Sequence, residues 1–313
     1  MEARLQLFSG GSNPALAAEI VEHLGVHRGR ALVSTYEDGE TRIRLEEHVR
    51  GSDVFVVQSL CAPVDHHIME LLLMVDAVRR CSASRVTAVI PYMAYAKQEK
   101  KTQGAREPIS AKLLANILAT AGADRFLAVD LHSAAIEGFF DIPVDHLRSA
   151  SMLAGYFERL YLPDLVVASP DTGGVARANE IRERLGASLA IIYRQGQNHK
   201  NRGSLEMVGD VVGKQVLIVD DMITTGHTLL SAAEFLTEKG AAEIYACATH
   251  GVFAGDALER IAASPIKRVV VTNTVPLPAT ANIDKLEVLS VGPLIAEAIL
   301  RIHKDISLSS LFM

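Results

Sequence analysis

The stretch that decides the fold is Val216-Leu-Ile-Val-Asp-Asp-Met-Ile-Thr-Thr-Gly-His-Thr228. Its first residues form a continuously apolar run, which is typical of a strand buried on both faces of a parallel sheet. Two carboxylates follow, and a short loop of small and hydroxylic residues then leads into a helical pattern. This order predicts a βα unit with a polar site at the carboxyl end of its strand.

The loop of this unit has the chemistry of a sugar-phosphate site. Backbone N–H groups at a helix start bind a phosphate dianion, and threonine hydroxyls add further donors. A glycine in the loop permits positive φ and a close backbone approach, and carboxylates accept hydrogen bonds from ribose 2- and 3-hydroxyls. The alternative is an acidic strand end before an ordinary capped helix. The candidate ribose-phosphate residues are Asp220, Asp221, Thr224, Thr225, Gly226, His227 and Thr228.

Outward from this unit, apolar runs alternate with helix-period segments along the whole chain. Strands are predicted at Arg4–Phe8, Asp53–Gln58, Arg85–Ile90, Arg125–Val129, Leu165–Ser169, Ser188–Tyr193, Gln215–Val219, Ile244–Thr249 and Arg268–Thr272. Helices are predicted at Pro14–Leu24, His67–Arg80, Ala111–Ala121, Met152–Leu160, Val175–Leu185, Thr228–Lys239 and Gly255–Ala263. This alternation predicts the α/β class, with parallel sheets that helices cover on both faces.

The length of 313 residues favours two domains. A boundary near Arg148–Ser151 gives an N-terminal α/β domain over 1–148 and a C-terminal domain over 149–301. We expect the tail, residues 302–313, to return to the N-terminal domain. The active site is expected between the domains at strand carboxyl ends, where open α/β sheets bind ligands.

Composition narrows the function classes. The net charge of −6 provides no basic field for nucleic acid or anionic lipid, so neither is an expected partner. Aromatic residues are only 5% of the chain and tryptophan is absent, which argues against a base-stacking platform. No apolar run approaches the length of a membrane span and no signal peptide is recognisable, so we expect a cytoplasmic protein. Cys61, Cys81 and Cys247 are expected to be buried free thiols.

The carboxylate-and-threonine loop resembles the phosphoribosyl-binding loop of phosphoribosyltransferases and of the diphosphokinases that make their substrate. Further segments resemble diphosphokinase blocks, in family order: Ile90–Gln98, Arg106–Lys112, Ala121–Asp124, Asp130–His132, Gly138–Asp145, Ser169–Val175, Thr249–Phe253 and Val271–Pro276. The similarity extends from Phe8-Ser-Gly10 to Ser309-Ser-Leu-Phe312. The chain is therefore identified as a member of the ribose-phosphate diphosphokinase (phosphoribosyl diphosphate synthetase) family, with two doubly wound parallel-sheet domains of phosphoribosyltransferase-like type.

The resemblance implies transfer of the β,γ-diphosphoryl group of Mg-ATP to the anomeric hydroxyl of ribose 5-phosphate, with AMP as the second product. It implies ATP contacts from Tyr36, Asp38, Glu40, Lys97, Gln98 and His132. It implies Mg²⁺ ligands at Asp130, His132 and Asp171, of which Asp171 also suits the ribose hydroxyls. Because the Tyr36 loop serves a neighbour's nucleotide in the family, we expect a dimer-based homo-oligomer, in the family a hexamer. Arg50, Ser82, Ser307 and Ser309 resemble residues of the family's regulatory phosphate and ADP site.

One departure from the family pattern concerns catalysis. Arg194 occupies the position of the usual catalytic lysine, and Gly196 stands where the family has a second cation. His199, Lys200 and Arg202 follow in the same loop and are candidate replacements. This departure leaves open a catalytically weak family member that binds nucleotide or ribose phosphate and regulates a partner. The Thr-Thr-Gly-His-Thr loop also leaves open a phosphoribosyltransferase acting on a base.

Overall fold

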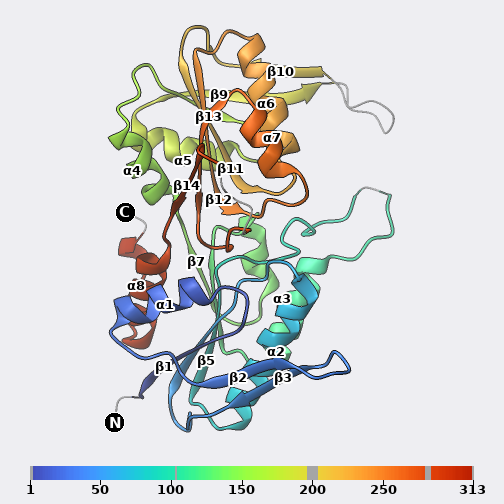
Figure 1. The fold of residues 1–313 in the computed structure, drawn as a ribbon, viewed down its shortest axis with the longest axis vertical. Coiled ribbons are helices and arrows are strands. Elements are labelled where there is room, and N and C mark those ends of the chain that lie inside the picture. The colour runs from blue at the N-terminus through green and yellow to red at the C-terminus, as the bar shows by residue number, and fades with distance from the viewer. Residues whose placement is uncertain (1–2, 103, 196–203, 279–282, 312–313) are drawn as a thin grey trace. The chain divides into compact units, whose positions relative to one another are not determined.

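The computed structural model describes residues 3–102, 104–195, 204–278 and 283–311. The chain divides into two compact units, which Figure 1 shows in chain colours. Unit 1 comprises Met1–Arg148, Thr274–Pro276 and Ser290–Met313. Unit 2 comprises Ser149–Asn273 and Leu277–Leu289.

Unit 1 is built on a parallel sheet with the strand order β1-β4-β5-β6-β7 among the described residues. These strands are β1 (Leu5–Ser9), β4 (Asp53–Val57), β5 (Arg85–Ile90), β6 (Arg125–Val129) and β7 (Val144–Leu147). Each pairs in parallel with its neighbour. The inner strand β4 is buried at every position, which agrees with its apolar run Val54–Val57 after Asp53.

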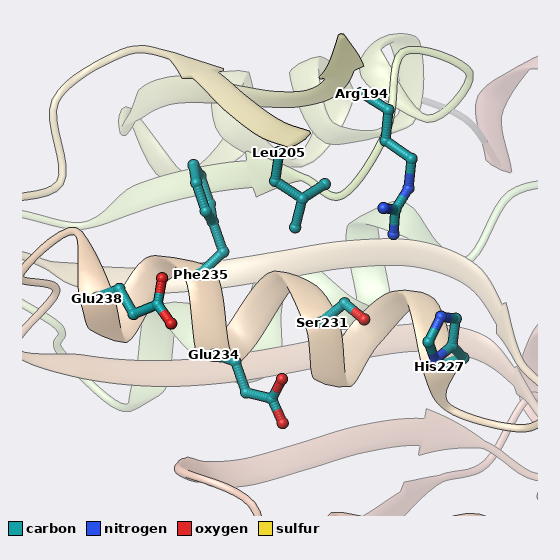
Figure 2. A pocket seen from close by; sticks show the side chains of 7 residues that line it. All are labelled: Arg194, Leu205, His227, Ser231, Glu234, Phe235 and Glu238. Atoms are coloured by element: carbon teal, nitrogen blue, oxygen red, sulfur yellow. The ribbon is translucent and has the colours of Figure 1, made fainter. Parts of the chain in front are cut away.

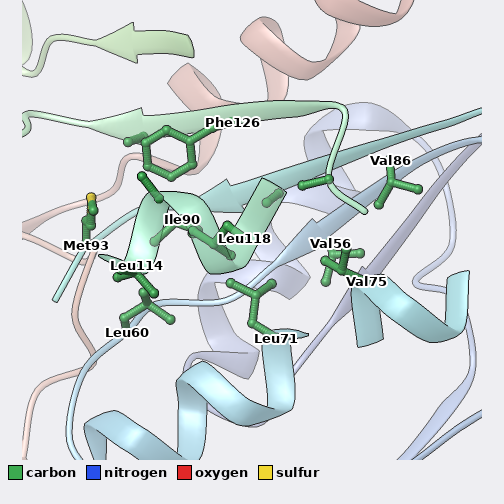
Figure 3. Close-up of a cluster of buried hydrophobic side chains, with 14 of the residues drawn as sticks. Val56, Leu60, Leu71, Val75, Val86, Ile90, Met93, Leu114, Leu118 and Phe126 are labelled. Carbon is green, nitrogen blue, oxygen red and sulfur yellow. The ribbon is translucent and has the colours of Figure 1, made fainter. Parts of the chain in front are cut away.

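The helices of unit 1 are α1 (Pro14–Leu24), α2 (Val64–Arg80), α3 (Ser110–Ala121) and α8 (Gly292–His303), with 3₁₀ turns at Ala134–Phe139 and Ser309–Leu311. Helices α2 and α3 contribute Leu71 and Leu118 to a core that also contains Phe126 (Figure 3). Helix α1 packs against α8, although the two are far apart in sequence. Local signals set the bounds of α1, because Asn13 caps its first turn and Gly25 ends it at φ 67°.

A two-stranded antiparallel hairpin, which the sequence analysis did not predict, extends unit 1. Its strands are β2 (Ala31–Thr35) and β3 (Thr41–Leu45), and residues 36–40 form its tip. Ala31, Val33, Ile43 and Leu45 pack on the core of unit 1. In β3, Ile43 and Leu45 alternate with Arg42 and Arg44, which is the period-2 pattern of a half-buried strand.

Unit 2 is built on a sheet with the order β10-β9-β8-β11-β12-β13-β14. Its strands are β8 (Val166–Ser169), β9 (Ser188–Gln195), β10 (Ser204–Val208), β11 (Gln215–Ile223), β12 (Glu243–Gly251), β13 (Ile266–Thr272) and β14 (Leu286–Leu289). Its helices are α4 (Ala150–Arg159), α5 (Val175–Leu185), α6 (His227–Glu238) and α7 (Ala257–Ala263). All described pairings are parallel except β9 with β10.

Helices cover both faces of the unit 2 sheet. Val216 and Ile218 of β11 belong to one core with residues of α6 and α7. The alternate residues Leu217 and Val219 belong to a second core with residues of α4 and α5. Because successive strand residues point to opposite faces, a strand covered on both sides must be apolar throughout. The α/β class and the parallel sheets are therefore confirmed.

Four details differ from the sequence-based expectations. Strand β10 pairs antiparallel with β9, because the two form a hairpin at the sheet edge. Strand β11 runs to Ile223, since residues up to there pair with β12, so the two carboxylates lie inside the strand. Helix α8 lies in unit 1, where it packs on α1, although its residues 292–301 were assigned to the C-terminal domain. Cys81 is exposed, because it follows the last turn of α2.

No helix in the described part of the chain is long and apolar enough to cross a membrane.

Candidate active site

The loop between β11 and α6 has the backbone geometry of an anion-binding loop. Gly226 adopts φ 71° directly before α6, a left-handed conformation that disfavours any residue with a Cβ. The Gly226 carbonyl accepts the first helical hydrogen bond, from Leu230 N at 2.8 Å. The preceding Thr224 carbonyl accepts a hydrogen bond from Ala254 N at 3.0 Å. These bonds fix the loop so that Thr224, Thr225, Gly226, His227 and Thr228 surround the start of α6.

Two adjacent carboxylates precede this loop on β11. The side chain of Asp221 is 3% exposed and that of Asp220 is 17% exposed. Asp220 Oδ1 accepts a hydrogen bond from Asp221 N at 2.8 Å. Burial raises the pKa of Asp220, and the negative charge of Asp221 adds to this effect. A carboxylate accepts several hydrogen bonds, so this pair suits the hydroxyls of a vicinal diol.

Asp171 lies in the loop between β8 and α5, and β8 is the direct neighbour of β11 in the sheet. Its Oδ1 accepts a hydrogen bond from Gly174 N at 2.9 Å, and its carbonyl accepts one from Ser169 Oγ at 2.7 Å. The loops after two neighbouring parallel strands meet at one sheet edge. The fold therefore brings Asp171 to the same edge as the β11 carboxylates.

Arg194 lies on β9 and contributes to a cavity of about 400 Å³ above α6. Figure 2 shows its guanidinium pointing toward the first turns of α6, where His227 and Ser231 lie. The lining residues are Arg194, Leu205, His227, Ser231, Glu234, Phe235 and Glu238. The structure thus places Arg194, the candidate catalytic cation, beside the helix that follows the β11–α6 loop. Gly196, His199, Lys200 and Arg202 lie outside the described residues.

The candidate nucleotide residues of unit 1 occupy two loops. Tyr36 is at the tip of the β2–β3 hairpin, 48% exposed, with the Arg42 guanidinium 5.2 Å from its ring centroid. Asp38 Oδ1 accepts a hydrogen bond from Glu40 N at 3.1 Å, which shapes the same tip. The ring therefore presents an aromatic surface on a braced turn.

Lys97 and Gln98 lie in the segment between β5 and α3, and both are exposed. Gln98 Oε1 accepts a hydrogen bond from Ser110 Oγ at 2.6 Å, which ties this loop to the first residue of α3. The structure thus presents the Lys97 amine and the Gln98 amide from a loop that follows a central strand.

Asp130 and His132 form a tight turn after β6. Asp130 has φ 39°, is 6% exposed, and its N–H donates to Leu147 O at 2.9 Å. His146 supports the turn, because its Nε2 accepts a hydrogen bond from Leu131 N at 2.8 Å while its Nδ1 lies 2.6 Å from Glu137 Oε1. Burial lowers the pKa of His146, which favours the neutral ring that this bond requires.

Comparisons with known proteins agree over both units. Residues 5–122 match the N-terminal domain of ribose phosphate pyrophosphokinase, and residues 194–313 match the phosphoribosyl synthetase-associated domain. The ribose-phosphate pyrophosphokinase of Caldanaerobacter subterraneus subsp. tengcongensis is 52% identical over 309 residues, 98% of each chain. That of Bacillus subtilis is 49% identical over 311 residues, which cover 99% of this chain and 98% of the relative.

The chain belongs to the ribose-phosphate pyrophosphokinase family. A solved structure supports the fold as well. The phosphoribosylpyrophosphate synthetase of Mycobacterium smegmatis superimposes with a TM-score of 0.92 at 42% identity, covering 96% of this chain and 99% of that one. The resemblance stated from the sequence is thereby confirmed.

Membership in the pyrophosphokinase family raises the question of Mg²⁺. Among the described residues, no group of three or more His, Cys, Asp or Glu side chains is arranged to hold a metal ion. Mg²⁺ is usually held by one or two carboxylates together with substrate phosphates and water. The buried carboxylate of Asp130 in unit 1 and the carboxylate of Asp171 in unit 2 each fit such a partial donor set by themselves, whereas the ring nitrogen of His132 is a less usual ligand.

The four regulatory candidates lie in unit 1. Arg50 and Ser82 are on loops that meet, since Gly51 N donates to Ser82 O at 2.8 Å. Ser307 Oγ donates to Ser309 Oγ at 3.0 Å, and Arg301 holds the Ser307 carbonyl at 2.9 Å. The loops of Arg50 and Ser82 therefore lie together, and so do Ser307 and Ser309. The regulatory role of these residues remains a prediction.

Two residues beside the candidate site, Arg177 and His146, were not predicted from the sequence. Arg177 on α5 lies within 4 Å of both β11 carboxylates, and His146 holds the Asp130 turn. Arg177 falls in the first turn of a predicted helix, just after the Asp171 loop. Its position at that helix start could therefore have indicated a place near the site. No sequence pattern indicated His146, because its contact with the Asp130 turn depends on the pairing of β6 with β7.

Proposed function

We infer that this chain is a ribose-phosphate diphosphokinase, which transfers the β,γ-diphosphoryl group of Mg-ATP to the anomeric hydroxyl of ribose 5-phosphate. The products are phosphoribosyl diphosphate and AMP. The observation that carries this conclusion is the β11–α6 loop, with two buried carboxylates and a left-handed glycine, in a chain 52% identical over 98% of its length to a ribose-phosphate pyrophosphokinase.

On this proposal, Asp220 and Asp221 accept hydrogen bonds from the ribose 2- and 3-hydroxyls. The backbone N–H groups of residues 224–228 and their hydroxyls bind the 5-phosphate at the start of α6. Arg194 is the catalytic residue. Its charge, directed toward the same helix, stabilises the negative charge that develops on the transferred group. Positioning and charge neutralisation provide most of the catalysis in phosphoryl transfer.

The nucleotide would be held by unit 1 residues. Tyr36 stacks on the adenine, Asp38 and Glu40 accept from its amino group, and Lys97 and Gln98 bind the phosphates. His132 contacts the ATP phosphates. Mg²⁺ held by Asp130, His132 and the ATP phosphates, and a second ion near Asp171, would neutralise charge on the diphosphoryl group when bound.

The experiment is formation of AMP and phosphoribosyl diphosphate from ATP, ribose 5-phosphate and Mg²⁺, with inorganic phosphate present. We expect turnover by the wild type and a loss of kcat of about 10²–10³-fold in Arg194→Ala, as for removal of a group that stabilises transition-state charge. Arg159→Ala, at the exposed end of α4, is the matched control and should keep its kcat. Folded wild type that binds ATP without turnover would contradict the enzyme assignment.

We also propose a homo-oligomer based on dimers, a hexamer by family analogy, in which the Tyr36 loop completes a neighbour's nucleotide site. Mixing Tyr36→Ala with Arg194→Ala at ATP well below the KM of Tyr36→Ala, where each variant alone has low activity, tests this, because mixed dimers contain one site with both groups intact. We expect the mixture to regain activity after subunit exchange. Absence of recovery in verified mixed oligomers would show that each site uses its own Tyr36.

A further inference from the structure

The pair of carboxylates on β11 has a cationic partner. Arg177 Nη1 lies 3.7 Å from Asp220 Oδ1 and 3.6 Å from Asp221 Oδ1. The Arg177 side chain is 19% exposed and comes from the first turn of α5. The Arg177 guanidinium therefore lies near both acids, although Arg177 belongs to α5 and the acids belong to β11.

The positive charge of Arg177 matters to Asp220 and Asp221, because two adjacent carboxylates with little exposure to water oppose each other's ionisation. Burial and the charge of Asp221 raise the pKa of Asp220, whereas the charge of Arg177 lowers it. On the β12 side lies the Cys247 thiol, whose pKa burial raises, so it contributes no charge at neutral pH. Arg177 is thus a cation that favours ionisation of Asp220.

The distances indicate how Arg177 acts. Both exceed the 2.7–3.2 Å range of N–H···O hydrogen bonds, so the guanidinium supplies charge to both acids without a close bond to either. A carboxylate in a close bidentate pair would have fewer lone pairs to offer. Charge at this range leaves acceptor capacity for hydroxyl donors of a ligand.

The start of α5, from which Arg177 extends, packs closely on the loop after β8. A Cβ added at Gly174 would lie 2.9 Å from Ser169 Oγ and 3.7 Å from Arg177 Nη1. Gly174 N also donates to Asp171 Oδ1, so the same residue anchors the Asp171 loop. Arg177 therefore links two βα loops of the sheet edge, the loop after β8 and the end of β11.

We propose that Arg177 is a positioning residue for ribose 5-phosphate, which favours the ionised form of Asp220 and holds Asp220 and Asp221 side by side so that they accept the 2- and 3-hydroxyls. The inference rests on the proposed function of this site and adds the residue that prepares it. Its role concerns the sugar substrate and leaves nucleotide binding unchanged.

The test is Arg177→Gln, with KM for ribose 5-phosphate and for ATP measured between pH 6 and pH 9. We expect KM for ribose 5-phosphate to rise by about tenfold or more at neutral pH, as for loss of a neighbouring opposite charge, while KM for ATP stays unchanged. Removing a cation raises the pKa of the acids. The pH below which ribose 5-phosphate binding weakens should therefore move upward by about one unit.

Two further variants complete the design. Arg177→Lys keeps the charge, so the pH below which ribose 5-phosphate binding weakens (the acid limb of the pH profile) should stay near that of the wild type. Its KM for ribose 5-phosphate should rise less than that of Arg177→Gln. Arg182→Gln, on the same helix but paired with Asn179 and Glu183, is the control and should change neither KM. If Arg177→Gln does not fold, the KM values of Arg177→Lys test the inference instead. A rise in its KM for ribose 5-phosphate alone supports the inference, and an equal rise for both substrates overturns it.

An Arg177→Gln enzyme with unchanged KM for ribose 5-phosphate, or with an unmoved acid limb, would refute the inference. Such a result with active wild type leaves the proposed function standing. Wild type that does not convert ATP and ribose 5-phosphate would instead refute the proposed function itself, so the two failures are distinguishable.

Discussion

At the scale of single residues, the candidate site contains two adjacent acids, Asp220 and Asp221, in a setting that disfavours the ionisation of both. The Asp220 side chain is 17% exposed and lies next to Asp221, which is 3% exposed. Burial of Asp220, together with the negative charge of Asp221, raises the pKa of Asp220 to about 7 from its ordinary value of 3.8. A folded-state pKa above the unfolded one means that the unfolded chain ionises more readily. The charge on Asp220 therefore costs folding stability, and this cost develops as the pH rises from about 4 to about 7.

Asp220→Asn should accordingly stabilise the protein while it weakens sugar binding. We expect the free energy of unfolding at pH 8 to increase by about 1–3 kcal/mol, with little change at pH 4, since one pKa unit corresponds to about 1.4 kcal/mol. Urea unfolding at the two pH values measures this. Asp210→Asn is the control, because Lys214 lowers the pKa of that exposed carboxyl and its removal should bring no gain. Equal changes at both pH values would contradict the electrostatic cause.

Tyr36 is exposed on a turn, so its substitution should affect binding without affecting folding. We expect Tyr36→Leu to raise KM for ATP by about 5–100-fold, the range for loss of one base–aromatic stacking contact. Tyr36→Phe keeps the ring and should change KM by less than about twofold. Steady-state kinetics and the thermal midpoint measure both effects. A fall in the midpoint with unchanged KM for ATP would mean that Tyr36 has a structural role.

At the scale of elements, the β9–β10 hairpin determines where Arg194 lies. Arg194 pairs with Leu205 across the hairpin, and Leu205 and Phe235 of α6 line the same cavity. The chain leaves β10 through Gly209, which has φ 118°. A Cβ there would lie 2.9 Å from Ala190 Cα and from Leu189 O, which are backbone atoms of β9. The glycine therefore permits the close approach of these strands.

Gly209→Ala should for this reason destabilise unit 2 by about 2–4 kcal/mol, the range for backbone strain combined with overpacking. Gly213→Ala is the matched control, because Gly213 also has positive φ (69°) but no atom within 4 Å of its added Cβ. It should cost only about 1 kcal/mol. Urea unfolding compares the two, and an equal cost would show that the contact with β9 is unimportant.

At the scale of the whole molecule, unit 1 is assembled from segments far apart in sequence. Its last helix, α8, is held by a buried ionic cluster. The Asp53 carboxylate, 2% exposed, accepts hydrogen bonds from Arg85 Nη2 at 2.6 Å and Nε at 2.8 Å, and lies 2.8 Å from His303 Nδ1. Arg85 also donates to Ile302 O at 2.8 Å. This cluster fastens the end of α8 to the first residues of β4 and β5.

Arg85→Met should therefore cost about 3–5 kcal/mol, because it leaves a buried carboxylate without its main partner. Arg80→Met is the control. Its pair with Asp76 is exposed on both sides, so we expect a change within about 0.5 kcal/mol. Chemical denaturation measures both, and hydrogen exchange of α8 locates the effect. A cost below about 1 kcal/mol for Arg85→Met would contradict the assigned role of the cluster.

The sequence by itself determined the α/β class, the helices and strands of the βα units and the family, because these depend on local periodicity and on motifs contiguous in the chain. The apolar run into Asp220 and Asp221, followed by Thr-Thr-Gly, was sufficient for the loop after β11. The site roles given to Tyr36, Lys97, His132 and Arg194 remain predictions.

Only the tertiary structure decided which distant residues meet. Arg177 reaches the β11 carboxylates because β8 and β11 are neighbours, and His146 holds the Asp130 turn because β6 pairs with β7. The placement of α8 beside α1 and the Asp53–Arg85–His303 cluster also depend on contacts more than 200 residues apart in the chain. Such contacts follow from strand order and packing, and no local pattern in the sequence records them.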